Sequence, residues 1–514
     1  MKKLNQLFGL FLLSQLSSCT KDIGNYTYND INEITITGVD PAYAGISGID
    51  TLKIVPNYEM TASTESQGQL QYTWVAKLNN DIVDTLGTTS NLNYPIKLLP
   101  NNYVVQLRVF DQKTNVTWTK KTNFTVGSIY SRGLMLLGED DNGIAEMDML
   151  SMVKDTVLVK NILAKSGLPP LRGPLVAQHT GGLDATIRVW VSTTSGGYFL
   201  DRVSMAGNLG NTFGKLVFLT DKIKKDELFP RAIAPEPVNV SGAVGSNFSR
   251  AVLTSNGYIF ANSLFGSPDL YGNPINRASS DFNTLLPAAP FLLYSKGSIN
   301  AVMWYDTKNN RFMNNSPLGL NLTSDILKDN AGEPFPWDQG ATGRRLIYAE
   351  NTRNSDGGSP NGNSFALMKD PNNTFFIYKF YVDGANPAKR GAYSVLPLAI
   401  DFEKADFYAF SSKSPIIFYA VGSRLYAYDY NPGNEKFYQF PSIGTDPITL
   451  LKFDTQIDIN SNSLYIGTYH PSKKGILRKF AVGTDPNTVT IQAVDNSHWE
   501  GLIKITSMNW RGVN

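Results

Sequence analysis

The sequence predicts an all-β protein in which an immunoglobulin-like sandwich precedes a β-propeller, with seven as the expected number of blades. Short segments of alternating apolar residues, typical of strands, fill residues 34–127. Seven pairs of apolar segments, each joined by a turn, follow within residues 128–514. Hydrophobic residues make up 42% of the chain and include 25 Tyr and 27 Phe, which is enough for a large core.

The first residues show the order of features found in a bacterial signal peptide. Lys2 and Lys3 precede the apolar run Leu7–Leu13, and small residues follow it. This run is shorter than the ~20 apolar residues that a membrane-spanning helix requires, so a permanent span is not expected. We therefore predict a signal peptide over residues 1–18 and a polar tether over residues 19–33.

The single cysteine of the chain ends the segment Leu16-Ser17-Ser18-Cys19. This segment resembles the bacterial lipobox, which implies cleavage before Cys19 and acylation of its thiol and of the new amino group. Several acyl chains together anchor a protein firmly, whereas one chain binds a membrane only marginally. The alternative is an ordinary signal peptide followed by an incidental cysteine.

The charge balance argues against a nucleic-acid partner. The chain has 46 Lys and Arg against 44 Asp and Glu, and residues 1–18 contain only Lys2 and Lys3 of these, so 44 basic residues face 44 acidic ones without them. A neutral chain offers no basic field for phosphates. With Cys19 acylated, neither a disulfide nor a cysteine metal site is expected, and no cofactor is predicted.

Residues 34–127 are predicted to form the sandwich. The stretches Tyr72-Thr-Trp74, Pro100-Asn-Asn-Tyr103 and Leu107–Asp111 resemble a PKD-like domain of the immunoglobulin type. That resemblance implies that Trp74 is a core anchor. The expected strands lie within Glu33–Val39, Thr51–Tyr58, Leu70–Leu78, Tyr103–Asp111 and Trp118–Val126.

Residues 128–514 are predicted to form the propeller, because strand pairs recur at intervals close to the ~40–50 residues of a propeller blade. A ring of blades would also protect the sheet edges of so large a β body. The alternative is two further sandwiches. The seven expected hairpins are Gly133–Met149, Ile187–Val203, Ala251–Ser263, Ala301–Asn315, Phe365–Phe380, Ile416–Tyr430 and Leu464–Phe480.

Catalytic motifs are scarce, and no enzyme is predicted. The only histidines are His179, His470 and His498, and none has the partner residues in the sequence that a catalytic mechanism needs. Neither Gly-x-Ser-x-Gly nor His-Glu-x-x-His occurs. The segment Gly138–Gly143, "GEDDNG", superficially resembles a calcium loop, but its ligands are out of register and a hairpin turn is expected. Paired carboxylates for glycoside cleavage leave little trace in a sequence, so this possibility stays open.

One loop, residues 331–345, combines prolines, an aromatic side chain and charged groups without periodicity. Loops on a rigid scaffold often carry recognition. We predict a ligand site here, in which Trp337 stacks on a sugar ring or aromatic group. Asp338, Arg344 and Arg345 would then hydrogen-bond the polar edge of that ligand.

The alternative for this loop is structural, with Phe335 and Trp337 only holding it on the body. A ligand platform predicts that Trp337→Ala lowers affinity more than tenfold, about 1.4 kcal/mol, at nearly unchanged melting temperature. A structural plug predicts a large loss of thermal stability. The neighbouring segment Arg353–Ser364 is rich in Gly, Ser and Asn and is predicted to be a mobile loop.

The order of lipobox, PKD-like module and large β domain resembles the PKD-like family lipoproteins of Gram-negative bacteria. The resemblance implies an outer-membrane lipoprotein that captures a nutrient, a glycan or a peptide. Asp22, just after Cys19, resembles the acidic export tag of such lipoproteins, so the protein is expected to face the cell exterior. Its implied partners are a TonB-dependent transporter and a Sus-type binding lipoprotein. Two other classes stay open. An adhesin or scaffold would bind another protein, and a glycan-active or peptide-active enzyme would need two carboxylates or a His cluster converging in a pocket.

The anchor gives the first testable prediction. Cys19→Ala removes the acylated thiol, so the protein should be released from the membrane into the soluble periplasmic fraction. Fractionation and palmitate labelling of cells that express the variant measure this. Membrane association and palmitate labelling that survive the substitution would show that the lipobox assignment is wrong.

Overall fold

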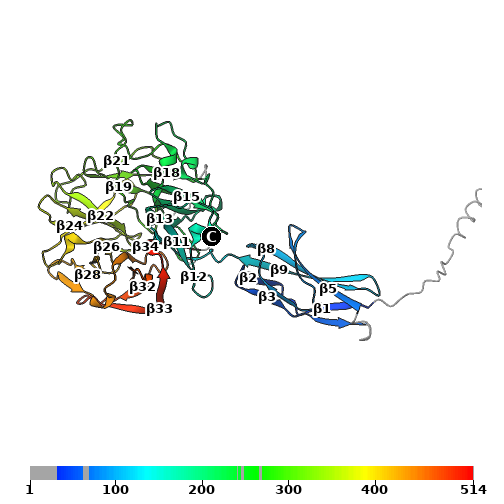
Figure 1. The fold of residues 1–514 in the computed structure, drawn as a ribbon. Helices are drawn as coiled ribbons and strands as arrows, with labels where there is room; N and C mark the ends of the chain where they lie inside the picture. Colours follow the sequence, from blue (N-terminus) through cyan, green and yellow to red (C-terminus); the bar gives the residue numbers. More distant parts are fainter. Residues whose placement is uncertain (1–31, 62–68, 240, 245–247, 265–268, 513–514) are drawn as a thin grey trace, which may run out of the picture. The chain divides into compact units, whose positions relative to one another are not determined.

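The computed structural model describes residues 32–61, 69–239, 241–244, 248–264 and 269–512. The signal peptide, Cys19 and nearly all of the tether lie outside these residues. The chain forms two compact units, of which the first ends at Gly127 and the second begins at Ser128. We call them the sandwich and the propeller (Figure 1).

The sandwich has the immunoglobulin-like character that its alternating strands predict. Trp74 is 1% exposed and its indole nitrogen donates a hydrogen bond to the carbonyl oxygen of Thr89 at 2.9 Å. Leu107 and Phe124 pack in the same core, so the predicted role of Trp74 as a core residue is confirmed. One sheet has five strands in the order β2 (Ala42–Ile46), β9 (Val116–Gly127), β8 (Asn101–Asp111), β5 (Leu70–Leu78) and β6 (Asp81–Gly87). Two smaller sheets pair β1 (Ile34–Thr37) with β4 (Asn57–Met60), and β3 (Thr51–Ile54) with β7 (Leu92–Pro95).

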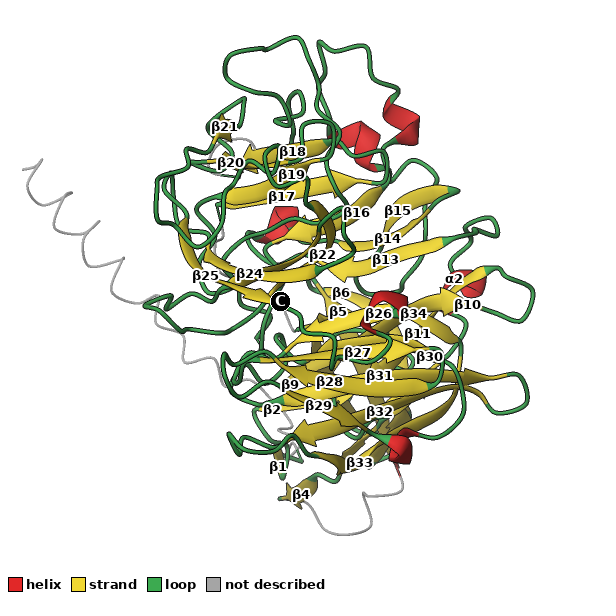
Figure 2. Cartoon of the chain, turned by 90° about the vertical axis from the view of Figure 1, so that its left-hand side faces the viewer, coloured by secondary structure: helices red, strands yellow, loops and turns green. Residues whose placement is uncertain are grey.

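The described part of the propeller contains seven antiparallel sheets, or blades, that follow one another along the chain (Figure 2). Blade 1 has the order β34 (Lys504–Arg511), β10 (Gly133–Glu139), β11 (Ala145–Ser151), β12 (Val157–Val159). Blade 2 is β13 (Pro174–His179), β14 (Val189–Thr193), β15 (Gly196–Leu200). Blade 3 is β16 (Pro230–Ala234), β17 (Ser249–Thr254), β18 (Ile259–Ser263). Blade 4 is β19 (Val302–Asp306), β20 (Arg311–Asn315), β21 (Asp325–Ile326).

Blades 5 to 7 have four strands each. Blade 5 is β22 (Arg345–Asn351), β23 (Ser364–Lys369), β24 (Phe375–Tyr381), β25 (Ala388–Ser394), and blade 6 is β26 (Phe407–Phe410), β27 (Ile416–Val421), β28 (Arg424–Asp429), β29 (Lys436–Gln439). Blade 7 is β30 (Ile448–Phe453), β31 (Ser463–His470), β32 (Lys474–Val482), β33 (Ile491–Leu502). The short helices of the propeller are α2 (Ile162–Lys165), η2 (Asp184–Thr186), η3 (Phe213–Leu216), η4 (Lys225–Glu227), η5 (Phe402–Lys404) and η6 (Pro441–Ile443).

Each blade contains one of the seven hairpins expected from the sequence. The turn at "GEDDNG" joins β10 to β11, where the Asp140 carboxylate accepts hydrogen bonds from the backbone N–H groups of Asn142 and Ile144. The hairpin assignment of this segment is therefore correct.

The blades close into a ring because the last strand of the chain joins the first blade. Strand β34 pairs with β10, with Leu134 opposite Trp510. At Gly138 the carbonyl oxygen of Lys504 lies 2.0 Å from the place where a Cβ atom would be, so only glycine fits this close approach. One hydrophobic cluster fills each gap between successive described blades, including the gap between blade 7 and blade 1. The predicted all-β fold with a seven-bladed propeller is confirmed.

Candidate functional site in the central channel

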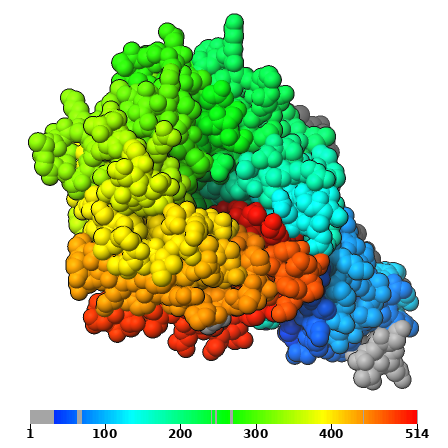
Figure 3. Space-filling model, turned by 60° about the vertical axis from the view of Figure 1, so that its left-hand side comes forward, coloured from blue at the N-terminus to red at the C-terminus, as the bar shows by residue number. Residues whose placement is uncertain are grey.

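The innermost strands of the ring surround a pocket of about 370 Å³ at the centre of the propeller. Its walls come from β34, β13, β16, β22, β26 and β30, and from the segment Leu292–Lys296 on the inner side of blade 4. Figure 3 shows the hollow in the middle of the propeller, with the red C-terminal strand beside it. Because all seven blades contribute, this pocket exists only in the closed ring.

The two ends of the pocket differ in exposure. Arg231, Asp406 and Thr506 are exposed lining residues at or near the first residues of their strands. Lys296 and Thr455 line the other end and are buried. The pocket therefore opens at the end where the innermost strands begin, and we call the opposite end the inner end.

Hydrogen bonds between loops of different blades cross the inner end. Arg353 Nε donates to the carbonyl oxygen of Thr455 at 3.3 Å, which joins blade 5 to blade 7. Gln456 Nε2 donates to the carbonyl oxygen of Pro237 at 3.1 Å, and the backbone N–H of Asn239 donates to the carbonyl oxygen of Gln456 at 2.6 Å. These contacts form a floor beneath the pocket.

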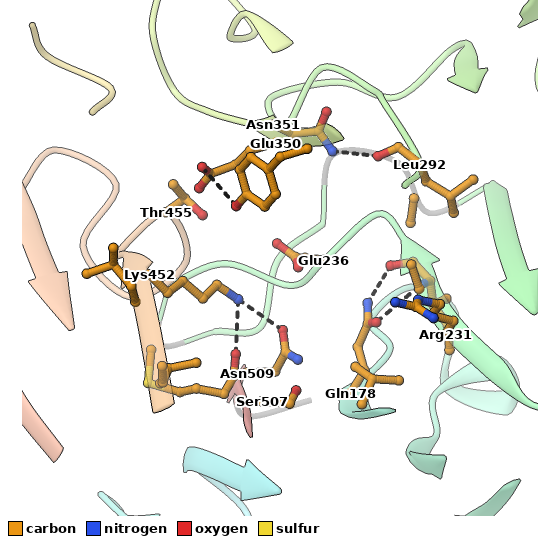
Figure 4. A pocket seen from close by; sticks show the side chains of 18 of the residues that line it. Gln178, Arg231, Glu236, Leu292, Glu350, Asn351, Lys452, Thr455, Ser507 and Asn509 are labelled. Carbon is orange, nitrogen blue, oxygen red and sulfur yellow. Dashed lines mark hydrogen bonds between the residues drawn. The ribbon is translucent and has the colours of Figure 1, made fainter. Parts of the chain in front are cut away.

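Glu236 lies at the centre of the inner end, as Figure 4 shows. Its carboxylate forms an ion pair with Lys296, and its backbone N–H donates to the Tyr294 hydroxyl at 3.2 Å. Burial alone would raise the pKa of Glu236, but the charges of Lys296, Lys452 and Arg353 outweigh burial and lower this pKa to about 2. Glu236 is therefore ionised throughout the physiological pH range.

Glu350 behaves in the opposite way. Its Oε2 accepts hydrogen bonds from the backbone N–H of Phe410 at 2.9 Å and from the Tyr348 hydroxyl at 3.3 Å. Burial raises the pKa of Glu350 to about 7 against the lowering effects of that backbone bond and of Lys296 and Lys452. Two carboxyl groups in one pocket thus differ in protonation near neutral pH.

The cations of the inner end exceed its ionised carboxylates. Lys452 donates to the carbonyl oxygen of Met508 at 3.0 Å and to the side-chain oxygens of Gln456 and Asn509 at 3.4 Å, which are all neutral acceptors. Arg353 Nη2 is buried and has no hydrogen-bond partner among the described residues. Burial lowers the pKa of Lys296 although Glu236 opposes this. The inner end can accordingly hold a negatively charged or strongly polar group.

Two amide side chains of the wall are occupied by structural hydrogen bonds. Gln178 exchanges two bonds with the backbone of Ile233 and so ties blade 2 to blade 3. Asn351 donates to the carbonyl oxygen of Leu292 at 2.8 Å and accepts from the N–H of Tyr294 at 3.0 Å. These amides fix the shape of the pocket.

The structure places Trp337 in the protein core. Its side chain is 3% exposed and packs edge-on against Phe312, Phe335 and Phe380 between blades 4 and 5. Lys389 Nζ lies 5.1 Å from the Trp337 ring centroid. The prediction that Trp337 is an exposed stacking platform is therefore wrong, because the ring is covered by other aromatic side chains. The structural alternative describes this loop.

The polar residues predicted beside Trp337 do not converge on one ligand site. Asp338 is exposed and its Oδ1 accepts the N–H of Gly340 at 2.8 Å, which caps a turn. Arg344 donates to the Tyr378 hydroxyl at 2.5 Å and stacks over the Phe376 ring with its Cζ 3.5 Å from the centroid. Arg345 is exposed at the start of β22 and lines a separate surface hollow with Lys369.

The three histidines have separate surroundings and different contacts. His179 is 1% exposed in β13, and the pKa of its imidazole is lowered well below the ordinary value by burial and by Arg511, Arg202 and Arg250. His470 contacts Ser472 at 2.8 Å, and His498 contacts Glu500 at 2.9 Å. Within the described ranges, no group of three or more His, Cys, Asp or Glu side chains is arranged to hold a metal ion.

The pocket residues had one signal in the sequence. Lys452 interrupts the apolar run of β30, and Glu350 interrupts the apolar part of β22. A lone charge in a buried strand indicates a special environment, because burying an unpaired charge is costly.

The segment Arg353–Ser364, predicted to be mobile, instead contains the fully buried Ser359 and Asn363 and begins with an arginine of the pocket floor. Hydrogen bonds within the segment hold it in place, because Asn363 Nδ2 donates to the side-chain oxygen of Asn354 at 2.8 Å and to the carbonyl oxygen of Asp356 at 3.0 Å.

Comparisons with known proteins give a family match for the N-terminal part of the chain and distantly similar solved structures. Residues 19–167 match the model of the PKD-like family, and no curated protein matches the chain. A quinonprotein alcohol dehydrogenase-like protein from Bacteroides thetaiotaomicron is 12% identical, with a TM-score of 0.37, and the alignment covers 92% of this chain and 96% of that one. YCF48 from Cyanidioschyzon merolae is 9% identical with a TM-score of 0.37, covering 65% and 89%. A chain of the mitotic checkpoint complex is 10% identical with a TM-score of 0.29, covering 66% and 86%. The N-terminal part of this chain is thus a PKD-like domain.

The burial of Trp337 generates a prediction about stability. Trp337→Ala leaves a cavity between blades 4 and 5 and should lower the free energy of unfolding by about 3–5 kcal/mol. Arg345→Ala, in the same segment but exposed, should change it by less than about 0.5 kcal/mol. Thermal denaturation of both variants measures this, and an unchanged melting temperature for Trp337→Ala would contradict the core assignment.

Glu350 generates a prediction about pH. Since folding raises its pKa from the ordinary 4.5 to about 7, the protonated form favours the folded state, and stability is lost as pH rises between these values. Glu350→Gln cannot ionise, so at pH 8 it should be more stable than the original protein, by up to about 3 kcal/mol. At pH 4.5 the difference should vanish. Melting curves of both proteins across this range provide the measurement, and a pH-independent difference would refute the assignment.

Proposed function

We propose that this protein is a ligand-binding protein of the cell surface, held in the outer membrane by acylated Cys19, with the central pocket as its binding site. The observation that carries the proposal is the charge at the inner end of the pocket. The charges of Lys296, Lys452 and Arg353 act on Glu236 there, and those of Lys296 and Lys452 act on the partly protonated Glu350.

Such a group of charges is unfavourable for folding. Removing ions from water costs several kcal/mol per ion, and hydrophobic residues of similar volume often serve stability as well or better. Apolar side chains fill the gaps between the blades, whereas the centre of the ring holds these charges. The polar centre is therefore better explained by binding than by stability.

The features of the N-terminus supply the location in this proposal. The lipobox-like segment implies an acyl anchor, and residues 20–33 would hold the body away from the membrane as a tether. None of the helices in the described part of the chain has the length and apolarity needed to cross a bilayer. The resemblance to Gram-negative PKD-like lipoproteins favours capture of a glycan or peptide beside a TonB-dependent transporter and a Sus-type lipoprotein.

A hydrolytic role is the second candidate, favoured by the pair of carboxyl groups. Glu350 carries a proton near neutral pH while Glu236 is ionised, which is the division that acid and base roles require. Glu236, however, is engaged by Lys296, so binding takes priority in the proposal. Hydrolysis of an oligosaccharide by the purified protein, abolished by Glu350→Gln, would establish the second candidate instead.

The binding proposal is tested by filling the pocket. Ser507 lines the wall on β34, and Ser507→Trp should occupy the space that a ligand needs. Ser472→Trp, on the exposed turn after β31, is the matched control. Both variants and the original protein are screened against a panel of soluble oligosaccharides and peptides by calorimetry.

We expect Ser507→Trp to weaken the binding of any hit more than tenfold, while Ser472→Trp leaves it unchanged. Circular dichroism and melting curves show that both variants are folded. A folded Ser507→Trp protein with unchanged affinity would move the binding site away from the central pocket.

A further inference from the structure

We infer that the inner end of the central pocket binds an anionic group of the ligand, a carboxylate or a phosphate, through Lys452 and Arg353. This inference rests on the proposed binding function and specifies the chemistry of what is bound. It concerns residues from blades 5 and 7 that the floor of the pocket brings together.

The charges at the inner end do not balance. Glu236 and Lys296 neutralise each other as an ion pair at the centre of the inner end. Glu236 also faces Lys452 and Arg353, whose charges lower its pKa further, but one carboxylate cannot balance three cations. The remaining carboxyl, Glu350, carries a proton over part of the physiological range. A positive excess therefore remains.

Lys452 contributes one of the unbalanced charges. All three of its hydrogen-bond acceptors are neutral oxygens. The nearby carboxylate of Asp454 lies 3.6 Å from Lys479 Nζ and caps the loop after β30 through the N–H groups of Gln456 and Ile457. Asp454 is thus engaged elsewhere, and the ammonium group on the pocket wall has no carboxylate within ion-pairing distance in the described structure.

Arg353 contributes another unbalanced charge. Its Nε is bonded to the carbonyl oxygen of Thr455, which lines the pocket, while its buried Nη2 lacks an acceptor among the described residues. Burial lowers the pKa of this guanidinium, which reflects the cost of its poorly solvated charge. Arg353 itself lies in the floor, behind the residues that line the pocket, and its unpaired guanidinium donor adds positive charge there. Such a donor suits a carboxylate or a phosphate that reaches the floor, because both accept several hydrogen bonds.

The proton on Glu350 gives this site a direction of pH dependence. The charged and titratable groups that line the pocket with it are Tyr348 from its own strand, Asp406 and Tyr408 from the start of blade 6, Tyr294 and Lys296 from the inner side of blade 4, Glu236, Lys452, and Arg231 toward the opening. Ionisation of Glu350 adds a negative charge among them and reduces the positive excess. An anion should therefore bind more tightly below about pH 7 than above it.

The experiment uses the full mature chain and simple probes. D-glucuronate presents a carboxylate, inorganic phosphate presents a phosphate, and methyl glucoside is the neutral control. Binding is followed by calorimetry and by thermal stabilisation at pH 6 and pH 8. We expect glucuronate or phosphate, but not the neutral sugar, to stabilise the protein, with weaker binding at pH 8.

Five variants connect the effect to the site. Lys452→Met should weaken anion binding at least tenfold, and Lys452→Arg should retain most of it, whereas Lys473→Met, at an exposed position, should leave it unchanged. Glu350→Gln should keep the affinity of pH 6 at pH 8. Arg353→Gln serves as a second test of the same site where Lys452→Met fails to fold.

The outcomes separate this inference from the proposed function. Anions that stabilise no better than methyl glucoside, or equal anion affinity in Lys452→Met, would overturn the anionic site. Should Ser507→Trp still abolish binding of a neutral ligand, the pocket remains the binding site and only the anionic chemistry is wrong. Whichever of glucuronate and phosphate binds more tightly shows whether the ligand's anionic group is a carboxylate or a phosphate.

Discussion

The pairing of β34 with β10 is the interaction on which the rest of the propeller depends. It places the last strand of the chain innermost in the first blade, so that the gap between blade 7 and blade 1 is filled like the other six. Without it, blade 1 would lack its innermost strand, and the row of hydrogen-bonding groups on β10 would be exposed. Gly138 permits the close approach of the two strands, because any side chain there would meet the backbone of Lys504.

Closure also creates the site. Each innermost strand turns one side toward the neighbouring blades and the other toward the centre, and the strands from all sides leave a central space that they line in common. Charged side chains there are only partly hydrated, which explains why two carboxyl groups, Glu236 and Glu350, have pKa values shifted in opposite directions. A directly bonded cation decides the direction of each pKa shift. Glu236 forms an ion pair with Lys296, whereas Glu350 accepts hydrogen bonds only from neutral donors.

The blades could be predicted from the sequence because a hairpin is local, with two apolar segments and a turn that suffice to identify it. The core role of Trp74 is implied by the resemblance to a PKD-like domain, and its place in an alternating strand agrees with that role. The pocket could not, since Glu236, Lys296, Arg353 and Lys452 come from blades far apart in the chain and only ring closure brings them together. Trp337 was misassigned because prolines and glycines indicate a loop but do not reveal whether its aromatic side chains face solvent. The loop folds back onto blades 4 and 5 and buries Phe335 and Trp337.

The central claim, that the middle of the ring binds a ligand through its inner end, is tested most directly by a crystal structure of the mature chain grown with D-glucuronate or with phosphate. The account predicts density for the anion inside the pocket, within hydrogen-bonding distance of Lys452 Nζ and the free nitrogen of Arg353. Anion density found only on the outer surface of the propeller, with the inner end occupied by water at concentrations that saturate binding in solution, would contradict it.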